Sequence, residues 1–333
     1  MPDRQSQILV LDAAEVRRLL TMDACVDLMA GTLADLARGI FHQPLRMIVR
    51  PPDAKGLLGL MPAYRASGPA LYGLKAICVF PENPKINKDA HQGSVMLFDG
   101  DTGELLSLMN ASTITAVRTA AVSAVATRLL AREDASQLAI IGAGVEARTH
   151  LAALSGVRTI TRTRVTSRTR QSADKFVEEV SSRFDFPIEA VDTAEEALDG
   201  ADIIVTVTNS LEPIVKRDWI SPGAHINGVG THSPASREID GATMGAATLF
   251  VDRRESAINE AGDYVLAVKE GLLNEDSIAA ELGELLIGTK EGRQTRDQIT
   301  LFKSLGLAVE DLACAQYLFA KAQELGAGSW VSF

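Results

Sequence analysis

The spacing of hydrophobic residues distinguishes three regions of the chain. Residues 45–109 carry short β-rich apolar runs, and residues 114–131 form an alanine-rich stretch without Gly or Pro, which predicts a helix. After residue 137, short apolar runs alternate with segments of helical spacing. Because strands that alternate with helices form parallel sheets covered on both faces, this third region predicts a doubly wound α/β fold.

The elements before residue 114 predict an α+β region. Asp12 and Glu15 have the spacing of a capping box that starts a short helix, and a second helix is expected at residues 22–38. The runs typical of strands are residues 45–51, 56–64, 72–80 and 94–100. The last of these turns at Asp99, Gly100 and Asp101 into a hairpin.

The third region supplies the strands of the parallel sheet. We expect strands at residues 138–141, 163–166, 188–191, 202–208, 225–229 and 249–251, with helices from Val145, at 171–184 and at 194–198. A final helix, residues 306–325, has apolar residues at helical spacing. If it packs back on the first region, that region is discontinuous in sequence.

Composition and charge exclude several classes of function. The chain of 333 residues has a net charge of -10 and a pI near 5.1, so we expect neither nucleic acid nor an anionic membrane as a partner. Cys25, Cys78 and Cys314 lack metal-ligand spacing, which predicts buried free thiols and no metal site. The first residues lack the pattern of a signal peptide, and no apolar run has the length of a membrane span. These features predict a cytoplasmic protein.

The segment Leu138 to His150 carries the clearest binding motif. Four apolar residues lead into G-x-G-x-x-A, the order expected for a buried strand, a tight turn and a helix that starts at the turn. Gly144 lets a pyrophosphate approach the backbone, and Ala147 lets helix and strand pack closely. An ordinary strand-to-helix turn has the same pattern, so the surrounding strands decide. The cofactor-binding residues predicted in this loop are Gly142, Ala143, Gly144, Val145 and Glu146.

The end of the next predicted strand selects the nucleotide. Ser167, Arg168, Thr169 and Arg170 follow it, with no acid before Asp174. An acid there would accept a hydrogen bond from the ribose of NAD, whereas Arg and hydroxyl groups suit the 2′-phosphate of NADP, so we favour NADP and leave NAD open. Alternatively, the two arginines are solvated residues at a helix start. Further residues expected to face the cofactor at strand ends are Thr206, Val207, Thr208, Val229 and Gly230.

Three cations interrupt apolar text in the first half of the chain: Arg46, Lys75 and Arg118. Each one alone is compatible with an exposed side chain. Together they suggest a pocket for a small anionic molecule, because Arg binds a carboxylate through two hydrogen bonds and a buried cation needs a partner. His232, just after a predicted strand end, is a candidate proton donor, and a structural or substrate-contact role is equally open.

These segments resemble the ornithine cyclodeaminase/mu-crystallin family. The motifs occur in family order from about His42 to Gln316: QPLRMIV, GLLGLMPAY, LKAICVF, HQGSVMLFD, ITAVRTAAVSAVAT, IIGAGVEA, ADIIVTVT, PGAHINGVGTHSPASREID and LFKSLGLAVED. The likeness is greatest to the ketimine reductase and mu-crystallin-like members. It implies a substrate-binding and dimerisation domain of residues 1–120 and 305–333, completed by C-terminal helices. It also implies a Rossmann NAD(P)-binding domain of residues 121–304 and a homodimer.

The resemblance also implies roles for single residues. Arg46, Lys75 and Arg118 match the substrate-carboxylate and catalytic cations. Ser94 takes the place of a hydroxyl residue beside substrate and cofactor, and His91 lies in the same turn. The tip Ser167–Arg168–Thr169 is similar to the NADP-using mu-crystallin version.

Two positions depart from the cyclodeaminase pattern. Cyclodeaminases carry an acid where this chain has Gly59, and both they and the family's alanine dehydrogenases carry an Asp where it has His232. Because those carboxylates orient or deprotonate a substrate amine, their loss argues against ornithine cyclisation and weakens alanine dehydrogenase.

The resulting hypothesis is an NAD(P)H-dependent reductase of an α-imino acid, such as the cyclic ketimine pyrroline-2-carboxylate. Arg46 and Arg118 would clamp the carboxylate and Lys75 would polarise the imine, with His232 as a possible proton source. The alternatives are a cyclodeaminase, an amino-acid dehydrogenase, or an iminosuccinate-type reductase in which Arg50 or His232 binds a second carboxylate. A non-catalytic NADP-binding protein of the mu-crystallin type also remains.

Overall fold

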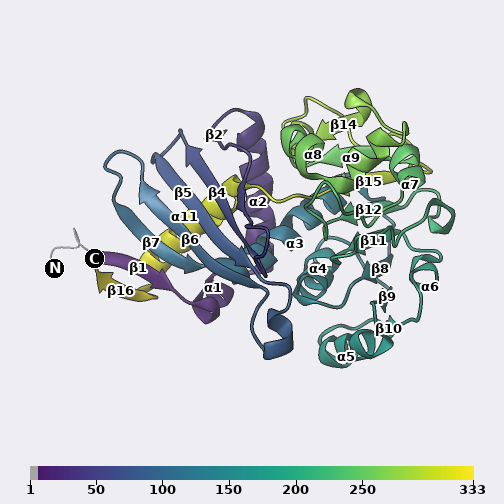
Figure 1. Ribbon diagram of the computed structural model, residues 1–333, viewed down its shortest axis with the longest axis horizontal. Coiled ribbons are helices and arrows are strands. Elements are labelled where there is room, and N and C mark those ends of the chain that lie inside the picture. Colours follow the sequence, from purple (N-terminus) through teal and green to yellow (C-terminus); the bar gives the residue numbers. More distant parts are fainter. Residues whose placement is uncertain (1–6) are drawn as a thin grey trace. The chain divides into compact units, whose positions relative to one another are not determined.

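The computed structural model describes residues 7–333, which form two compact units (Figure 1). One unit comprises the described residues up to Arg118 together with Leu307–Phe333, and the other is Thr119–Gly306. The division falls inside a single helix, α3 (Ala111–Leu130). The expected domain boundaries lay at residues 120 and 304. The prediction that the first residues do not form a signal peptide concerns a segment whose residues 1–6 lie outside the described residues.

The first unit is built on a mostly antiparallel sheet. Its strands run in the order β16-β1-β7-β6-β5-β4-β2, with β3 paired to β4. They are β1 (Gln7–Leu11), β2 (Phe41–His42), β3 (Met47–Val49), β4 (Leu57–Arg65), β5 (Leu71–Val79), β6 (His91–Asp99), β7 (Leu105–Asn110) and β16 (Ser329–Ser332). The predicted hairpin is confirmed, because the Asp99 carboxylate accepts hydrogen bonds from the Asp101 and Thr102 amides and closes the turn between β6 and β7. Strands β1 and β16 were not predicted.

Helices cover one face of this sheet. They are α1 (Ala13–Leu19), α2 (Met22–Ala37) and α11 (Ala308–Leu325). Helix α11 lies on β4, β5 and β6, and it approaches closely because a Cβ at Gly73 would come within 2.9 Å of Leu312 Cδ1. The predicted C-terminal helices are therefore a single helix in the described chain, followed by strand β16. Asp12 caps α1 as expected, whereas the Glu15 carboxylate binds the Gly328 amide instead of completing a capping box.

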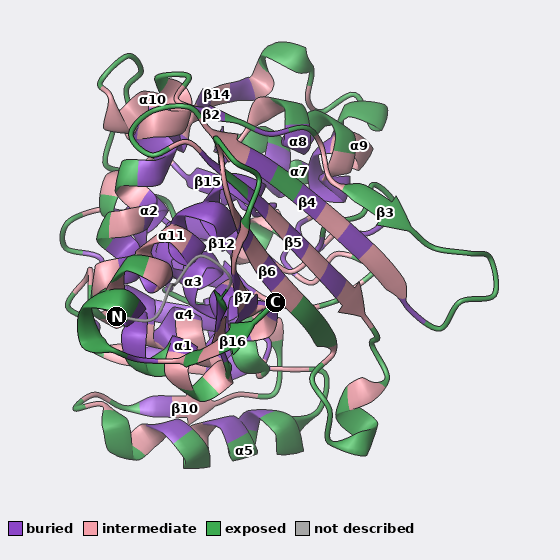
Figure 2. Cartoon of the chain, turned by 90° about the vertical axis from the view of Figure 1, so that its left-hand side faces the viewer, coloured by how far each residue is buried: buried purple, intermediate pink, exposed green. Residues whose placement is uncertain are grey.

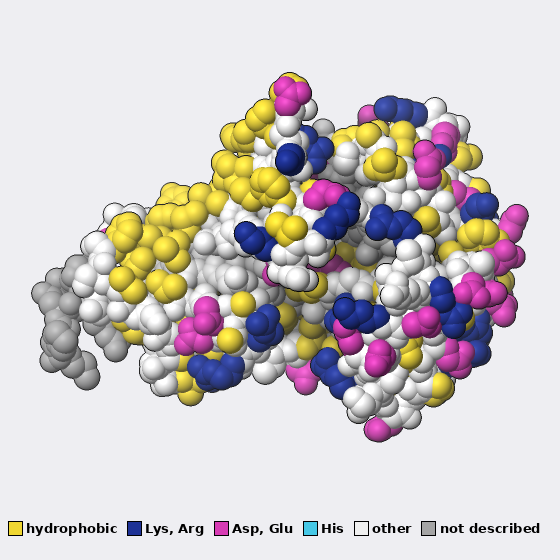
Figure 3. Space-filling model, turned by 60° about the horizontal axis from the view of Figure 1, so that its bottom comes forward, with side chains coloured by type: hydrophobic (Ala, Val, Ile, Leu, Met, Phe, Trp, Pro, Cys, Tyr) yellow, Lys and Arg dark blue, Asp and Glu magenta, His cyan; other side chains and the backbone are white. Residues whose placement is uncertain are grey.

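The other face of the sheet is apolar and reaches solvent. Along β4, β5 and β6 buried residues alternate with half-buried ones, which Figure 2 shows as stripes across the strands. The side chains on this face include Leu58, Leu60, Tyr64, Tyr72, Leu74, Met96, Phe98 and Leu108. In Figure 3 hydrophobic side chains gather over one side of the first unit, with few charged side chains among them.

The second unit is a doubly wound parallel fold. All eight strands are parallel, in the order β10-β9-β8-β11-β12-β15-β13-β14. Successive residues of β8 face opposite ways, so Ala139 packs into one hydrophobic core and Ile140 into another. Helices therefore cover both faces, as predicted.

The strands of this unit are β8 (Gln137–Ile141), β9 (Arg162–Thr166), β10 (Ile188–Ala190), β11 (Ile203–Thr206), β12 (His225–Gly228), β13 (Thr248–Val251), β14 (Ile278–Glu281) and β15 (Thr300–Lys303). Its helices after α3 are α4 (Val145–Ser155), α5 (Arg170–Val180), α6 (Ala194–Leu198), α7 (Gly241–Ala246), α8 (Arg254–Glu260), α9 (Gly262–Lys269) and α10 (Leu282–Leu286). Short 3-10 helices occur at Asn83–Ile86, Ser181–Arg183, Arg217–Trp219 and Glu275–Ser277. Strands β14 and β15 and helices α7 to α10 were not predicted.

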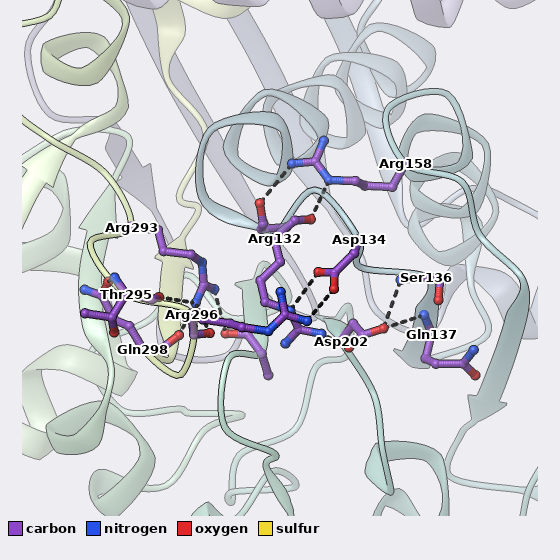
Figure 4. Close-up of polar contacts among 12 residues, drawn as sticks. Arg132, Asp134, Ser136, Gln137, Arg158, Asp202, Arg293, Thr295, Arg296 and Gln298 are labelled. Carbon is purple, nitrogen blue, oxygen red and sulfur yellow. Dashed lines mark hydrogen bonds and ion pairs between the residues drawn. The ribbon is translucent and has the colours of Figure 1, made fainter.

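An arginine network fixes the start of β8 (Figure 4). Arg158 donates to carbonyl oxygens at the end of α3, including that of Thr127 at 2.9 Å, and to that of Arg132 at 2.9 Å. Arg132 in turn pairs with Asp202, whose Oδ2 accepts the amides of Ser136 at 2.9 Å and Gln137 at 3.0 Å. The strand that leads to the glycine motif is thus held at its first residue.

The structure also bears on the exclusions made from composition. Within residues 7–333 no helix has the length and hydrophobicity needed to cross a membrane. Cys25 and Cys314 are buried free thiols as expected, whereas Cys78 is only half-buried. In the same residues no group of three or more His, Cys, Asp or Glu side chains is placed to hold a metal ion.

Candidate active site

The glycine motif forms an open turn between β8 and α4. Gly142 has a φ of 124°, and a Cβ there would lie 2.7 Å from the Val207 carbonyl oxygen, so only glycine fits. A Cβ at Gly144 would meet nothing within 4 Å, and no side chain caps α4. The first amides of the helix therefore border open space beside the backbone, which fits the pyrophosphate of a dinucleotide. Ala147 is fully buried against the sheet, as its small size predicted.

The strand ends bring the other predicted cofactor residues to the same edge of the sheet. Ile141 pairs with Thr166 and with Thr206, and Thr206 pairs with Gly228. The predicted strand at 202–208 ends early, at Thr206, because the Thr208 amide leaves the sheet and donates to the Glu238 carboxylate at 2.7 Å. Ligands bind at this carboxyl edge in open parallel sheets.

At the tip after β9 the two arginines differ. Arg170 pairs with Asp174 at 2.8 Å and with Asp192 at 2.7 Å. Arg168 is exposed, and within the described residues it pairs with no acid. Thr169 caps α5, and its carbonyl oxygen accepts a hydrogen bond from Ser167 at 2.9 Å. The tip therefore presents one arginine that is available to a ligand.

In the first unit two of the predicted cations are buried and paired. Lys75 is 3% exposed, and its Nζ lies 2.8 Å from Asp311 Oδ2. Arg118 is 4% exposed, with one guanidinium nitrogen 2.8 Å from Glu310 Oε2 and its Nε 3.3 Å from Asp311 Oδ1. Surface exposure is therefore wrong for both. Arg46, just before β3, is half-buried and close enough to affect the titration of Lys75.

This cluster alters the titration of its members. Burial, the charge of Arg118 and that of Arg46 lower the pKa of Lys75 to about 8, although Asp311 acts in the opposite direction. His91 is exposed, at the start of β6. Burial and the charges of Lys75 and Arg118 lower the pKa of His91 against the effect of Asp89. An amine with a pKa near neutrality can exchange a proton with a substrate.

Sequence reasoning missed the acidic half of the cluster. Glu310 and Asp311 stand side by side in the apolar segment AVEDLACA of α11 and are both buried. Two acids in such a segment are a signal, because each is costly to bury without a partner. The ionised side chains of Lys75, Arg118, Glu310 and Asp311 balance one another in charge, and the positive charge of Arg46 acts on Lys75.

The other predicted site residues are on different faces or in different parts of the fold. Ser94 pairs with Ala76, next to Lys75, so its side chain points to the opposite face of the sheet. His91 lies on the Lys75 face instead. His232 is exposed and belongs to the second unit, and Arg50 is exposed after β3.

Gly59 lies on the Lys75 face of β4, opposite Ile77. A Cβ there would lie 3.6 Å from Ile48 Cδ1 and 3.6 Å from Ile77 Cγ2. The surroundings of this position are thus apolar, with no carboxylate of its own to hold a second amine.

Comparison with known proteins agrees with these features. The family model of the ornithine cyclodeaminase/mu-crystallin family matches residues 6–326 of this chain. The chain belongs to this family. It is 38% identical over 327 residues to a Delta(1)-pyrroline-2-carboxylate reductase of Bacillus thuringiensis subsp. konkukian, covering 98% of this chain and 100% of the relative.

Two further family members are similar over almost their whole length. Ketimine reductase mu-crystallin of Mus musculus is 39% identical over 313 residues, which cover 93% of this chain and 96% of the mouse protein. The structure of Thermococcus litoralis Delta(1)-pyrroline-2-carboxylate reductase in complex with NADH and L-proline superposes with a TM-score of 0.93. That protein is 39% identical, and the match covers 97% of this chain and 99% of the other. The resemblance inferred from the motifs and the α/β fold class are confirmed.

Proposed function

We propose that this chain is an NAD(P)H-dependent reductase of cyclic α-imino acids such as pyrroline-2-carboxylate, which it converts to the L-amino acid. The observation that carries the proposal is the buried cluster of Lys75 and Arg118 with Glu310 and Asp311. Its two cations, with Arg46 close enough to act on Lys75, suit a substrate that carries a carboxylate. The apolar surroundings of Gly59 suit a hydrocarbon ring better than a second amine. The names of the bacterial and mouse relatives point to the same reaction.

The cations would bind different groups of the substrate, the arginines its carboxylate and the lysine its imine. Arg46 and Arg118 bind the carboxylate and so fix the plane of the C=N bond, since an arginine holds a carboxylate through two parallel hydrogen bonds. Glu310 and Asp311 hold the Arg118 guanidinium in one orientation. A bound reduced nicotinamide supplies the hydride that the imine carbon accepts.

Lys75 is the residue that we assign to the imine nitrogen of the substrate. Its ammonium group donates toward that nitrogen and raises the electrophilicity of the adjacent carbon. Asp311, 2.8 Å from Nζ, keeps the ammonium oriented and charged against the effect of burial. His232 is the other proposed proton source, acting directly or through a water molecule.

For the cofactor we propose NADP(H) in preference to NAD(H). The exposed Arg168, with Ser167 and Thr169 beside it, suits the 2′-phosphate, while Arg170 is already paired with two acids. The glycine turn would hold the pyrophosphate, with its residues Gly142, Ala143, Gly144, Val145 and Glu146. The residues proposed to border the rest of the cofactor are Thr206, Val207, Thr208, Val229 and Gly230.

We also propose that the protein is a homodimer that covers the apolar sheet face of the first unit. Contiguous apolar surface of this kind marks association sites in proteins. Tyr72 on this face is 50% exposed, and its ring contacts that of Tyr64 in a tilted arrangement with centroids 4.6 Å apart. Light scattering coupled to size exclusion tests this, and a monomeric mass at micromolar concentration would contradict it.

The test of the function is an oxidation screen with NADPH and NADH. Cyclic ketimines with five- and six-membered rings, and acyclic imino acids formed from keto acids and amines, are supplied in turn. We expect turnover of the cyclic ketimines. Release of ammonia from ornithine without oxidation of either cofactor would make the chain a cyclodeaminase. Absence of any turnover would favour a binding protein.

A further inference from the structure

The Glu238 carboxylate joins the ends of two parallel strands in the second unit. Its Oε1 accepts the backbone amide and the hydroxyl of Thr208, both at 2.7 Å. Its Oε2 accepts the Thr206 hydroxyl at 2.8 Å and the Gly230 amide at 2.7 Å. Thr206 ends β11 and Thr208 follows it, and Gly230 follows β12. One side chain thus receives four hydrogen bonds from both strand ends.

The backbone segments around this carboxylate are tightly packed. A Cβ at Gly230 would lie 2.0 Å from the Thr208 carbonyl oxygen and 2.6 Å from Glu238 Oε1, so the two strand ends touch. Glu238 itself is 0% exposed. A fully buried acid is costly unless hydrogen bonds and a countercharge compensate it.

Two further buried charges hold Glu238 in place. Asp263 Oδ1 accepts the amides of Glu238 at 2.8 Å and Ile239 at 2.9 Å. Asp263 Oδ2 lies 3.0 Å from Lys303 Nζ and accepts the Thr231 hydroxyl at 3.0 Å. Burial raises the pKa of Glu238, while the charge of Lys303 lowers it again. The ammonium group of Lys303 therefore favours the ionised carboxylate that the four donors require.

We infer that Glu238 is a positioning residue for the nicotinamide end of the cofactor, held in this role by Asp263 and Lys303. The inference rests on the proposed function, because it assumes that the strand ends Thr206–Thr208 and Val229–Gly230 border the nicotinamide. The Glu238 carboxylate bonds to both segments. It therefore sets the distance between them without touching the substrate. In the glycine turn between β8 and α4, by contrast, the first amides are left to the pyrophosphate.

The test compares two ligands that share every part except the nicotinamide end. Glu238→Gln keeps the shape of the side chain but replaces one acceptor oxygen by an NH2 group, which opposes two of the four donors. We expect the Kd of NADPH, measured by its fluorescence, to rise about tenfold. The Kd of 2′-phospho-ADP-ribose, measured by calorimetry, should stay within about twofold. Glu212→Gln, an exposed acid in the neighbouring loop, is the matched control and should change neither value.

Equal weakening of both ligands would overturn the inference, because it would mean that the carboxylate only supports the domain. An unchanged Kd of NADPH would overturn it as well. If Glu238→Gln does not fold, Glu238→Asp keeps the charge but shortens the side chain by one methylene, and it should weaken NADPH alone, by about threefold. All these measurements are made without an imino acid. A wild-type protein that binds NADPH but reduces no imine would therefore refute the proposed function, while the Kd comparison would still test the role of Glu238.

Discussion

Each unit buries a cluster of charged side chains, and the two clusters differ in what they do with their hydrogen-bonding groups. In the second unit the carboxylate oxygens of Glu238 and Asp263 accept hydrogen bonds from the protein's own amides and hydroxyls, and Lys303 is the countercharge. In the first unit Glu310 and Asp311 pair with the cationic side chains of Lys75 and Arg118, and the charge of Arg46 acts on Lys75. Carboxylates bonded to backbone amides fix the backbone, whereas carboxylates paired with cationic side chains orient the groups proposed to bind the substrate.

The largest effect is expected from removing the amine of the first cluster. Lys75→Met should lower kcat/KM for a cyclic ketimine by about a thousandfold, because it removes the ammonium group proposed to polarise the imine. The Kd of NADPH should remain as in the wild type. Lys88→Met, an exposed lysine in the same unit, serves as control and should leave turnover unchanged. Retention of wild-type turnover in Lys75→Met would remove the catalytic role from the first cluster.

Arg118→Met tests whether the same cluster also stabilises the fold. The variant leaves Glu310 and Asp311 without their guanidinium, and breaking a buried pair costs about 3 kcal/mol of the free energy of unfolding. Denaturant titration measures this loss, and KM for the imino acid should rise in the same variant. An unchanged KM together with the lost stability would make Arg118 purely structural.

The pH dependence of turnover should report Lys75. Its pKa is lowered to about 8, and the proposed role needs the protonated amine. The reductive kcat/KM should therefore be level below this pH and fall about tenfold per pH unit above it. Lys75→Arg keeps the charge at every accessible pH. If the decline persists unchanged in that variant, it belongs to the substrate or to another group.

The smallest effect concerns the cofactor tip. Arg168→Ser should reduce the preference for NADPH over NADH by about tenfold, through the loss of a charged hydrogen-bond donor to the 2′-phosphate. Arg170→Ser is the comparison variant, since Arg170 already pairs with Asp174 and Asp192. The ratio of kcat/KM for the two cofactors gives the answer. A larger change in Arg170→Ser would mean that the wrong arginine has been assigned.

The parallel sheet could be predicted up to β13 because its strands are short apolar runs separated by clear helices. Strands β14 and β15 were missed because they lie among short helices, and β15 ends in Lys303, a residue that local sequence does not mark as buried. Likewise β1 and β16 pair across the whole length of the chain, which periodicity cannot reveal. Such pairings depend on tertiary contacts.

The sites show the same limit. The cations stood out because each interrupts apolar text, but their partners Glu310 and Asp311 lie 192 and 193 residues beyond Arg118. Ser94 was matched by its place in a motif, and strand alternation turns it to the face opposite Lys75. The burial of Glu238 could not be predicted, because its donors are two backbone amides and two threonine hydroxyls, which carry no charge that would mark them in the sequence. The sequence shows which residues are charged. Their partners can be identified only from the fold.

The most direct test of the central claim is transfer of deuterium from C4-deuterated NADPH to pyrroline-2-carboxylate. If the Lys75 cluster holds this imine for reduction, L-proline should form with one deuterium at its α-carbon, detected by mass spectrometry and proton NMR. Oxidation of the cofactor without deuterium in proline, or no proline at all from any cyclic ketimine, would contradict the account.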